Sequence, residues 1–175
     1  MKGTIDADLP DAQRKITEDK KESAEHITIV DLIRNDLNMV ADNIQVEKFR
    51  YTEKIKTNYK NLLQVSSEIK GVLPKNYNEN LGTIFSALMP AGSVSGAPKK
   101  KTIEIIGFVE TYKRGFYSGV AGYFNGQDLD SFVMIRFIEN NKGNFTFKSG
   151  GGITSLSVLE KEYQELIDKI YIPLK

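Results

Sequence analysis

Residues 10 to 39 carry apolar positions at helical spacing, with Ile29, Leu32 and Ile33 on one face. Pro10 opens this stretch, as is common at the start of a helix. We therefore expect helical structure here. Residues 44 to 73 differ, because β-branched and aromatic residues recur there between polar ones. This second pattern predicts hairpin-like strands.

Residues 80 to 89 predict a short helix that ends in a cluster of breakers at residues 90 to 98. A second helix should follow, with Ser95 as its N-cap. Pro98 would lie in its first turn, where a missing N–H costs little. That helix would place three apolar residues on one face: Ile103, Ile106 and Val109.

The C-terminal third predicts antiparallel hairpins and a closing helix. The strand-like runs lie at residues 117 to 124, 131 to 138 and 144 to 148. Turns at Gly126 and at residues 140 to 143 separate them. A helix from Val158 to Tyr171 would be stopped by Pro173. Because helices and strands do not strictly alternate, we expect an α+β fold, an antiparallel sheet covered by helices, and one domain as the simplest count.

The 175-residue chain has a formal net charge of +1 and no cysteine. This balance gives no basic field for nucleic acid, and the lack of cysteine excludes disulfides and cysteine-based zinc sites. No apolar stretch approaches the roughly 20 residues of a membrane span, and no signal-peptide pattern opens the chain. We expect a cytoplasmic protein with neither a nucleic-acid nor a membrane partner.

A glycine-rich turn precedes a helix that carries two carboxylates on one face. Glycines at 150 to 152 let backbone N–H groups approach an anion closely. Glu162 and Glu165 are three residues apart, as are Glu22 and Glu25 in the first helical region. These pairs are either ligands for a divalent cation such as Mg²⁺ or solvated helix faces.

Other polar residues have equally open interpretations. Arg136 stands in an apolar run, so it needs a charged partner if it is buried, either a structural carboxylate or that of a substrate. His26 is the only histidine and is interpreted as a packing or helix-terminal residue. Asp31 and Arg34 favour an ion pair within the helix. The segment at residues 92 to 99 lacks the Walker pattern but suits a ligand-contacting turn.

Taken in order, blocks over nearly the whole chain resemble the C-terminal part of the chorismate-utilising enzymes, such as anthranilate, aminodeoxychorismate and isochorismate synthases. The matching blocks are Ala24-Glu25-His26 with residues 29 to 37, residues 92 to 99, Gly122-Tyr123, Ile135-Arg136, residues 150 to 153 and residues 162 to 169. The resemblance implies the chorismate-binding fold, with residues 1 to 175 as its C-terminal part and the N-terminal half absent.

The resemblance also implies site residues. Glu25, Glu162 and Glu165 would bind Mg²⁺, with Glu22 as an additional carboxylate. The contacts to chorismate would be Tyr123, Arg136, Lys169, Gln64, Ser95 and the backbone of Gly150, Gly151 and Gly152. A cation, an arginine, a lysine and backbone donors supply the countercharge that a dicarboxylate needs.

Lys2 within Lys2-Gly3-Thr4 points to one branch of this family. In aminodeoxychorismate synthases the corresponding lysine is the nucleophile that adds to the ring, whereas anthranilate synthases have a small residue there. The resemblance thus implies amination of chorismate to 4-amino-4-deoxychorismate, for 4-aminobenzoate and folate synthesis. A glutamine amidotransferase subunit would supply the ammonia.

Two departures from the family pattern qualify this expectation. The Ser-Pro-Glu motif, whose glutamate protonates the departing hydroxyl, is absent, so the chain is expected to be an inactive fragment with exposed apolar surface. Gln64 stands where many members have histidine. The alternatives are a fragment of an anthranilate or isochorismate synthase, and a non-catalytic remnant that binds chorismate.

Overall fold

A computed structural model describes residues 4–56, 61–155, 157–168 and 170. The chain divides into two compact units, Met1–Val109 and Glu110–Lys175, which are considered separately. Unit 1 contains three strands, β1 (Thr4–Asp6), β2 (Asp42–Lys56) and β3 (Asn61–Val72). Its helices are α1 (Ala12–Glu18), α2 (Lys20–Leu37), the 3₁₀ turn η1 (Tyr77–Glu79), α3 (Leu81–Leu88), α4 (Gly92–Ser95) and α5 (Lys99–Val109).

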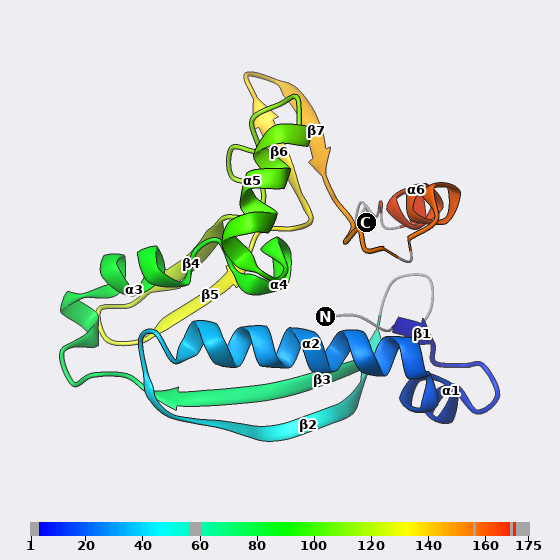
Figure 1. Cartoon of the computed structure of the whole chain (residues 1–175), viewed down its shortest axis with the longest axis horizontal. Coiled ribbons are helices and arrows are strands. Elements are labelled where there is room, and N and C mark those ends of the chain that lie inside the picture. Colours follow the sequence, from blue (N-terminus) through cyan, green and yellow to red (C-terminus); the bar gives the residue numbers. More distant parts are fainter. Residues whose placement is uncertain (1–3, 57–60, 156, 169, 171–175) are drawn as a thin grey trace. The chain divides into compact units, whose positions relative to one another are not determined.

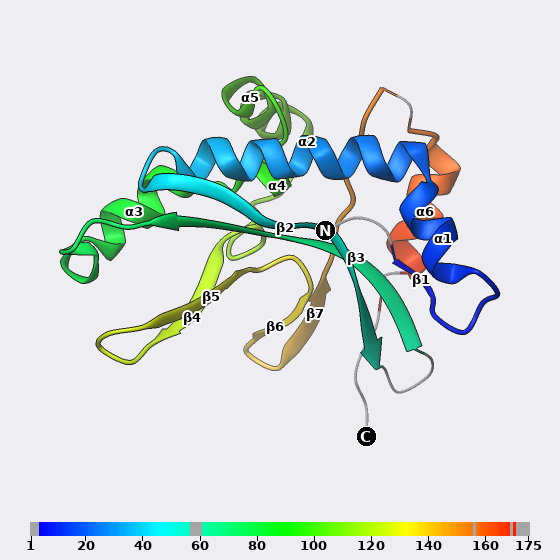
Figure 2. The ribbon, with the colours of Figure 1, turned by 90° about the horizontal axis from the view of Figure 1, so that it is seen from below.

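The sheet of unit 1 is antiparallel, with strand order β1-β3-β2. Its register places Thr4 and Glu53 on either side of Gln64. Helix α2 runs alongside the long β2-β3 hairpin (Figures 1 and 2) and contacts both strands. The small core beneath the helices contains Ala12, Ile16, Val30 and Val65. The predicted helical and extended regions are therefore both confirmed.

Helix α2 begins at a clear cap. The Asp19 side chain accepts a hydrogen bond from Glu22 N at 2.9 Å, which satisfies one of the free amides of the first turn. Further along, Arg34 Nη1 lies 3.6 Å from Asp31 Oδ1, so the expected ion pair within the helix is confirmed. Both members are exposed, and such pairs contribute little to stability.

The breaker cluster contains a short helix that the sequence did not predict, α4. The predicted role of Ser95 as an N-cap is wrong, because Ser95 ends α4 and its hydroxyl donates to Ala91 O at 3.0 Å. Helix α5 instead begins after Pro98, whose carbonyl accepts from Thr102 N. A positive φ of 86° at Gly96 separates the two helices, a conformation that glycine adopts without strain.

Unit 2 contains two antiparallel hairpins followed by helix α6 (Leu159–Asp168). The strands are β4 (Val120–Phe124), β5 (Leu129–Val133), β6 (Phe137–Asn141) and β7 (Asn144–Lys148). The β6-β7 turn has positive φ at Lys142 and Gly143, as a two-residue hairpin turn requires. Tyr171 and Pro173, which the sequence assigns to the end of the last helix, lie outside the described residues.

One predicted strand is wrong in unit 2. Residues 131 to 138 do not form a single strand, because β5 pairs with β4 and β6 pairs with β7 in a different sheet. Residues 134 to 136 form the bend between them. The α+β class with antiparallel sheets is nevertheless confirmed. Among the described residues, no helix is long and apolar enough to cross a membrane.

Candidate functional site

The glycine loop of unit 2 follows β7 and lies beside helix α6. A Cβ at Gly150 would collide with the hydroxyl of Tyr117, so the backbone approaches that ring as only glycine allows. At Gly151 the position of a Cβ would be 4.0 Å from Glu162 Oε2. The structure thus brings together two of the predicted site elements, the anion-binding turn and one acidic residue.

Ser157 connects this loop to α6. Its Oγ donates to Glu162 Oε1 at 2.6 Å and accepts from Thr154 N at 3.0 Å. The Ser149 hydroxyl oxygen, which directly precedes the glycines, is buried and has no hydrogen-bond partner among the described residues. A buried polar atom without a partner is costly, and a bound ion is one of the ways in which such an atom is satisfied. Sequence reasoning did not identify Ser157.

Tyr117 is held against the loop by a neighbouring charge network. Arg114 donates two hydrogen bonds to Glu110, at 2.6 and 2.8 Å, and a third to Ser118 Oγ at 2.8 Å. Its guanidinium lies 5.5 Å from the centre of the Tyr117 ring. Burial raises the pKa of Tyr117, with the positive charges of Arg114 and Arg136 acting against it. Tyr117 therefore carries its hydroxyl proton at neutral pH.

The other predicted residues of unit 2 have different environments. Tyr123 is in β4 opposite Asp130 and is 75% exposed. Arg136 is exposed and lies in the bend before β6, so it is not part of the predicted strand, and the condition that it be buried is not met. It does lie within electrostatic range of Tyr117. Lys169 and Lys2 lie outside the described residues.

The predicted metal ligands are divided between the two units. Glu22 and Glu25 are half-buried on α2, whereas Glu162 and Glu165 are on α6. In the described parts of the chain, no three histidine, aspartate or glutamate side chains gather as a metal site. As donors, carboxylates at this spacing suit a hard cation such as Mg²⁺. The Glu162 oxygen that lies beside the glycine loop, Oε2, suits it as well.

Gln64 is buried on β3, with only 7% of its surface exposed. Its amide Nε2 donates to Ser66 Oγ at 3.3 Å, and Ser66 Oγ donates to Glu53 Oε2 at 2.7 Å. Thr4, two residues after Lys2, pairs with Gln64 across the sheet. Gln64 thus lies in a polar chain across the strands that the sequence did not reveal.

The segment at residues 92 to 99, which begins with α4 and includes Ser95, is fixed to α2 by Asp36. Asp36 Oδ2 accepts from Gly92 N at 2.7 Å, and Oδ1 is 2.6 Å from Lys99 Nζ. Both side chains of the ion pair are largely buried. Gly92 leaves no room for a Cβ, which would stand 2.9 Å from Asp36 Oδ2. Two sequence blocks that are far apart in the chain therefore form one packed structure.

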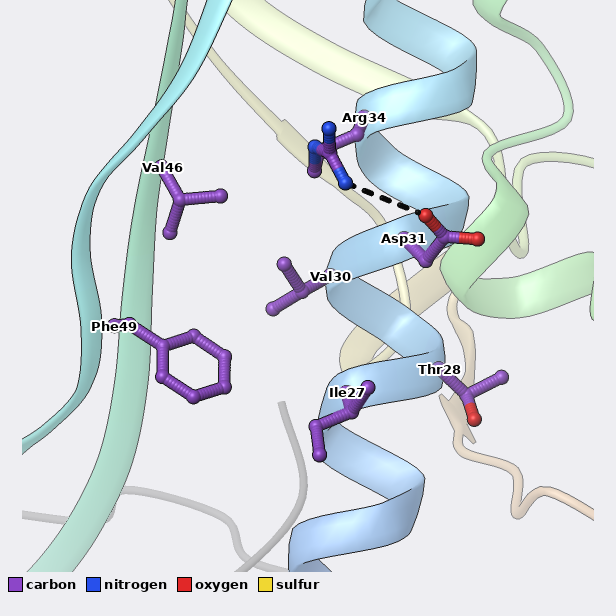
Figure 3. Close-up of a pocket in the computed structure, with 7 residues that line it drawn as sticks. All are labelled: Ile27, Thr28, Val30, Asp31, Arg34, Val46 and Phe49. Carbon is purple, nitrogen blue, oxygen red and sulfur yellow. Dashed lines mark ion pairs between the residues drawn. The ribbon is translucent and has the colours of Figure 1, made fainter.

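A shallow apolar groove of about 590 Å³ lies between α2 and β2 (Figure 3). Ile27, Val30, Val46 and Phe49 form its walls, with the Asp31–Arg34 ion pair beside them. Among the described residues, none of the predicted site residues lines it. Ile27 and Phe49 remain about half exposed there.

Comparison with known proteins identifies the family. The sequence profile of the chorismate binding enzymes matches residues 1–175. The chain belongs to this family. The family-level resemblance drawn from the sequence blocks is thereby confirmed.

Two uncharacterized PabA-like proteins are similar to the chain over its whole length. The protein from Pasteurella multocida is 55% identical over 99% of this chain and 54% of its own length. The protein from Haemophilus influenzae is 53% identical over 100% of this chain and 53% of its own length. The chain thus spans about half the length of the curated relatives it matches.

Relatives with assigned names belong to more than one branch. Aminodeoxychorismate synthase component 1 of Bacillus subtilis is 35% identical over 90% of this chain and 33% of its own length. Among solved structures, a putative 2,3-dihydroxybenzoate-specific isochorismate synthase, DhbC from Bacillus anthracis, has a TM-score of 0.74 at 25% identity. That match covers 95% of this chain and 45% of the other. The fold assignment is confirmed by this match.

Proposed function

We propose that this chain is the C-terminal part of an aminodeoxychorismate synthase component I. The whole enzyme would convert chorismate and ammonia to 4-amino-4-deoxychorismate, on the route to 4-aminobenzoate and folate. The Lys2-Gly3-Thr4 sequence carries this proposal, because the lysine is the family feature of the aminodeoxychorismate branch. The similarity to the Bacillus subtilis aminodeoxychorismate synthase component 1 supports it.

Recognition of chorismate would rest on charge. The substrate carries two carboxylates, and the glycine loop offers backbone N–H groups beside the buried hydroxyl of Ser149. Arg136 and Lys169 would add positive charge, while Tyr123 and Gln64 would donate hydrogen bonds. Ser95 would contact chorismate from the segment that Asp36 fixes to α2, and it does not cap a helix N-terminus.

Mg²⁺ would be bound by Glu25, Glu162 and Glu165, with Glu22 as an additional carboxylate. When bound, the ion would hold the ring carboxylate of chorismate and offset its charge. One carboxylate oxygen of Glu162 is held by a hydrogen bond from Ser157.

Lys2 would be the nucleophile. Its neutral amine adds to ring carbon 2 as the 4-hydroxyl leaves as water, and ammonia then adds to carbon 4 while the lysine departs. Protonation of the leaving hydroxyl requires an acid, which in the family is the glutamate of the Ser-Pro-Glu motif. A glutamine amidotransferase subunit would release the ammonia. The complete catalytic site therefore needs polypeptide beyond these 175 residues.

The proposal is tested by assaying the complete protein with chorismate, Mg²⁺ and ammonium and identifying the product by mass spectrometry. We expect 4-amino-4-deoxychorismate, and a Lys2→Ala variant that forms none while still binding chorismate. Lys20→Ala provides a matched control, because Lys20 is an exposed lysine at the start of α2. Undiminished product from Lys2→Ala would refute the nucleophile role.

Anthranilate synthase is the second candidate, because a relative of that name from Acetivibrio thermocellus is 38% identical over 93% of this chain and 32% of its own length. The same assay distinguishes the two, since that reaction gives 2-aminobenzoate and pyruvate. Isochorismate formed without ammonia would indicate the isochorismate branch. Mg²⁺-dependent binding of chorismate without turnover in the complete protein would identify a binding remnant.

A further inference from the structure

The hydroxyl of Ser157 both accepts and donates a hydrogen bond, and the two bonds together fix its orientation. Its oxygen accepts from Thr154 N at 3.0 Å, and its proton is donated to Glu162 Oε1 at 2.6 Å. The first bond fixes the serine within the loop after the glycines. The second bond fixes one oxygen of a side chain that otherwise has several accessible rotamers. The loop and helix α6 are therefore joined through one hydroxyl.

The second carboxylate oxygen of Glu162 faces the glycine loop. Oε2 is 4.0 Å from the position of a Cβ on Gly151, and glycine leaves that space free of side-chain atoms. A hydroxyl is an uncharged donor, so it orients the carboxylate without cancelling its negative charge. A lysine or arginine in the same place would offset the charge that a cation requires. The contact thus suits a carboxylate that binds a cation through its other oxygen.

We propose that Ser157 is a positioning residue that holds the Glu162 carboxylate ready to bind a divalent cation through Oε2. This inference rests on the proposed function, in which Glu162 is a Mg²⁺ ligand. Residues that hydrogen-bond a metal ligand orient it and raise the affinity of the site. Ser157 would also link cation binding to the loop that receives the substrate anion, because the same hydroxyl accepts from Thr154 N.

The test compares Mg²⁺ binding by the 175-residue chain and its variants, in the presence of chorismate, by isothermal titration calorimetry. Ser157→Ala should weaken Mg²⁺ binding about tenfold. Ser157→Thr keeps the hydroxyl and should restore most of the affinity. Ser155→Ala is the matched control, because Ser155 is an exposed serine in the same loop. It should bind Mg²⁺ like the wild type.

Thermal unfolding of each variant separates positioning from folding. A Ser157→Ala chain that melts with the wild type but binds Mg²⁺ more weakly supports the proposal. If Ser157→Ala binds Mg²⁺ as tightly as the wild type, or if Ser157→Thr is as weak as Ser157→Ala, the positioning role is refuted while the metal site stands. If the wild-type chain binds no Mg²⁺, both the metal site and the role of Ser157 are refuted.

Discussion

At the scale of single residues, Asp36 fixes the segment at residues 92 to 99 to helix α2. It satisfies the amide of Gly92 and the charge of Lys99 together, in a largely buried setting. Asp36→Asn leaves Lys99 without its counter-ion, so we expect a loss of ~2 kcal/mol in the free energy of unfolding, measured by urea denaturation.

The matched control for this variant is Asp31→Asn on the same helix. Asp31 is exposed, and its ion pair with Arg34 spans 3.6 Å. Removing an exposed pair of this kind should cost less than about 0.5 kcal/mol. Equal losses from the two substitutions would show that the Asp36 contacts do not fix the loop.

At the same scale, His26 should make the stability of the protein depend on pH. It is buried on α2, and its Nε2 is 2.7 Å from Ser67 Oγ. Burial, followed by the positive charge of Arg50, lowers the pKa of His26. The stability that neutral His26 contributes to the folded state is therefore fully present above the pKa of the unfolded state, about 6.5. This stability is lost as the pH falls through the lower pKa of the folded state.

The expected result is a stability that decreases below about pH 6.5 in the wild type, with a shallower decrease in His26→Gln. Urea denaturation at steps between neutral and mildly acidic pH measures this. Glutamine is chosen because it retains a side-chain amide for Ser67 but does not titrate. Parallel pH profiles for the two proteins would rule out His26 as the source.

At the scale of elements, the glycine loop and the Tyr117 ring constrain one another. Gly150→Ala places a methyl group against the Tyr117 hydroxyl, with the ring carbon Cζ 3.0 Å from it. We expect this overpacking to cost about 1–3 kcal/mol in the free energy of unfolding. Tyr117→Phe removes the nearest atom, so part of the loss should be recovered in the double variant.

A double-mutant cycle measured by denaturation checks this coupling. Gly151→Ala provides the control, because its Cβ would face Glu162 and not Tyr117. It should combine additively with Tyr117→Phe. Additive losses for Gly150→Ala and Tyr117→Phe would contradict the close approach of the loop to the ring.

The elements themselves were largely predictable from the sequence, since helical spacing indicated α2 and alternation indicated the β2-β3 hairpin. The error at residues 131 to 138 has a physical cause. Met134 continues the backbone pairing with Ser118 and Gly119, after which Phe137 pairs with Lys148. An apolar run shows that residues can be strands but does not show where the pairing partner changes.

The candidate site was predictable only in part. Family blocks indicated the glycine loop and the acidic helix, and Gly151 does lie near Glu162. The contacts that orient these groups were not predictable, because they join segments whose approach depends on the fold. Lys99 and Asp36 are 63 residues apart in sequence. Neither side chain indicates its partner without the tertiary structure.

At the scale of the whole molecule, about half of each PabA-like relative corresponds to this chain. Large apolar side chains are widely exposed, including Phe108 at 91% and Phe116 at 70%. Exposed apolar surface of this extent suits contact with further polypeptide. The catalytic proposal therefore concerns the complete protein, whereas recognition of chorismate is the function to test in this chain.

The most direct test of the central claim is calorimetric titration of the 175-residue chain with chorismate, with and without Mg²⁺. Binding should require Mg²⁺ and should be weakened by Glu162→Gln, which removes a charged oxygen ligand. Glu160→Gln, at an exposed position on the same helix, should leave binding unchanged. Absence of chorismate binding in the presence of Mg²⁺, or binding that is indifferent to Mg²⁺ and to Glu162, would contradict the account.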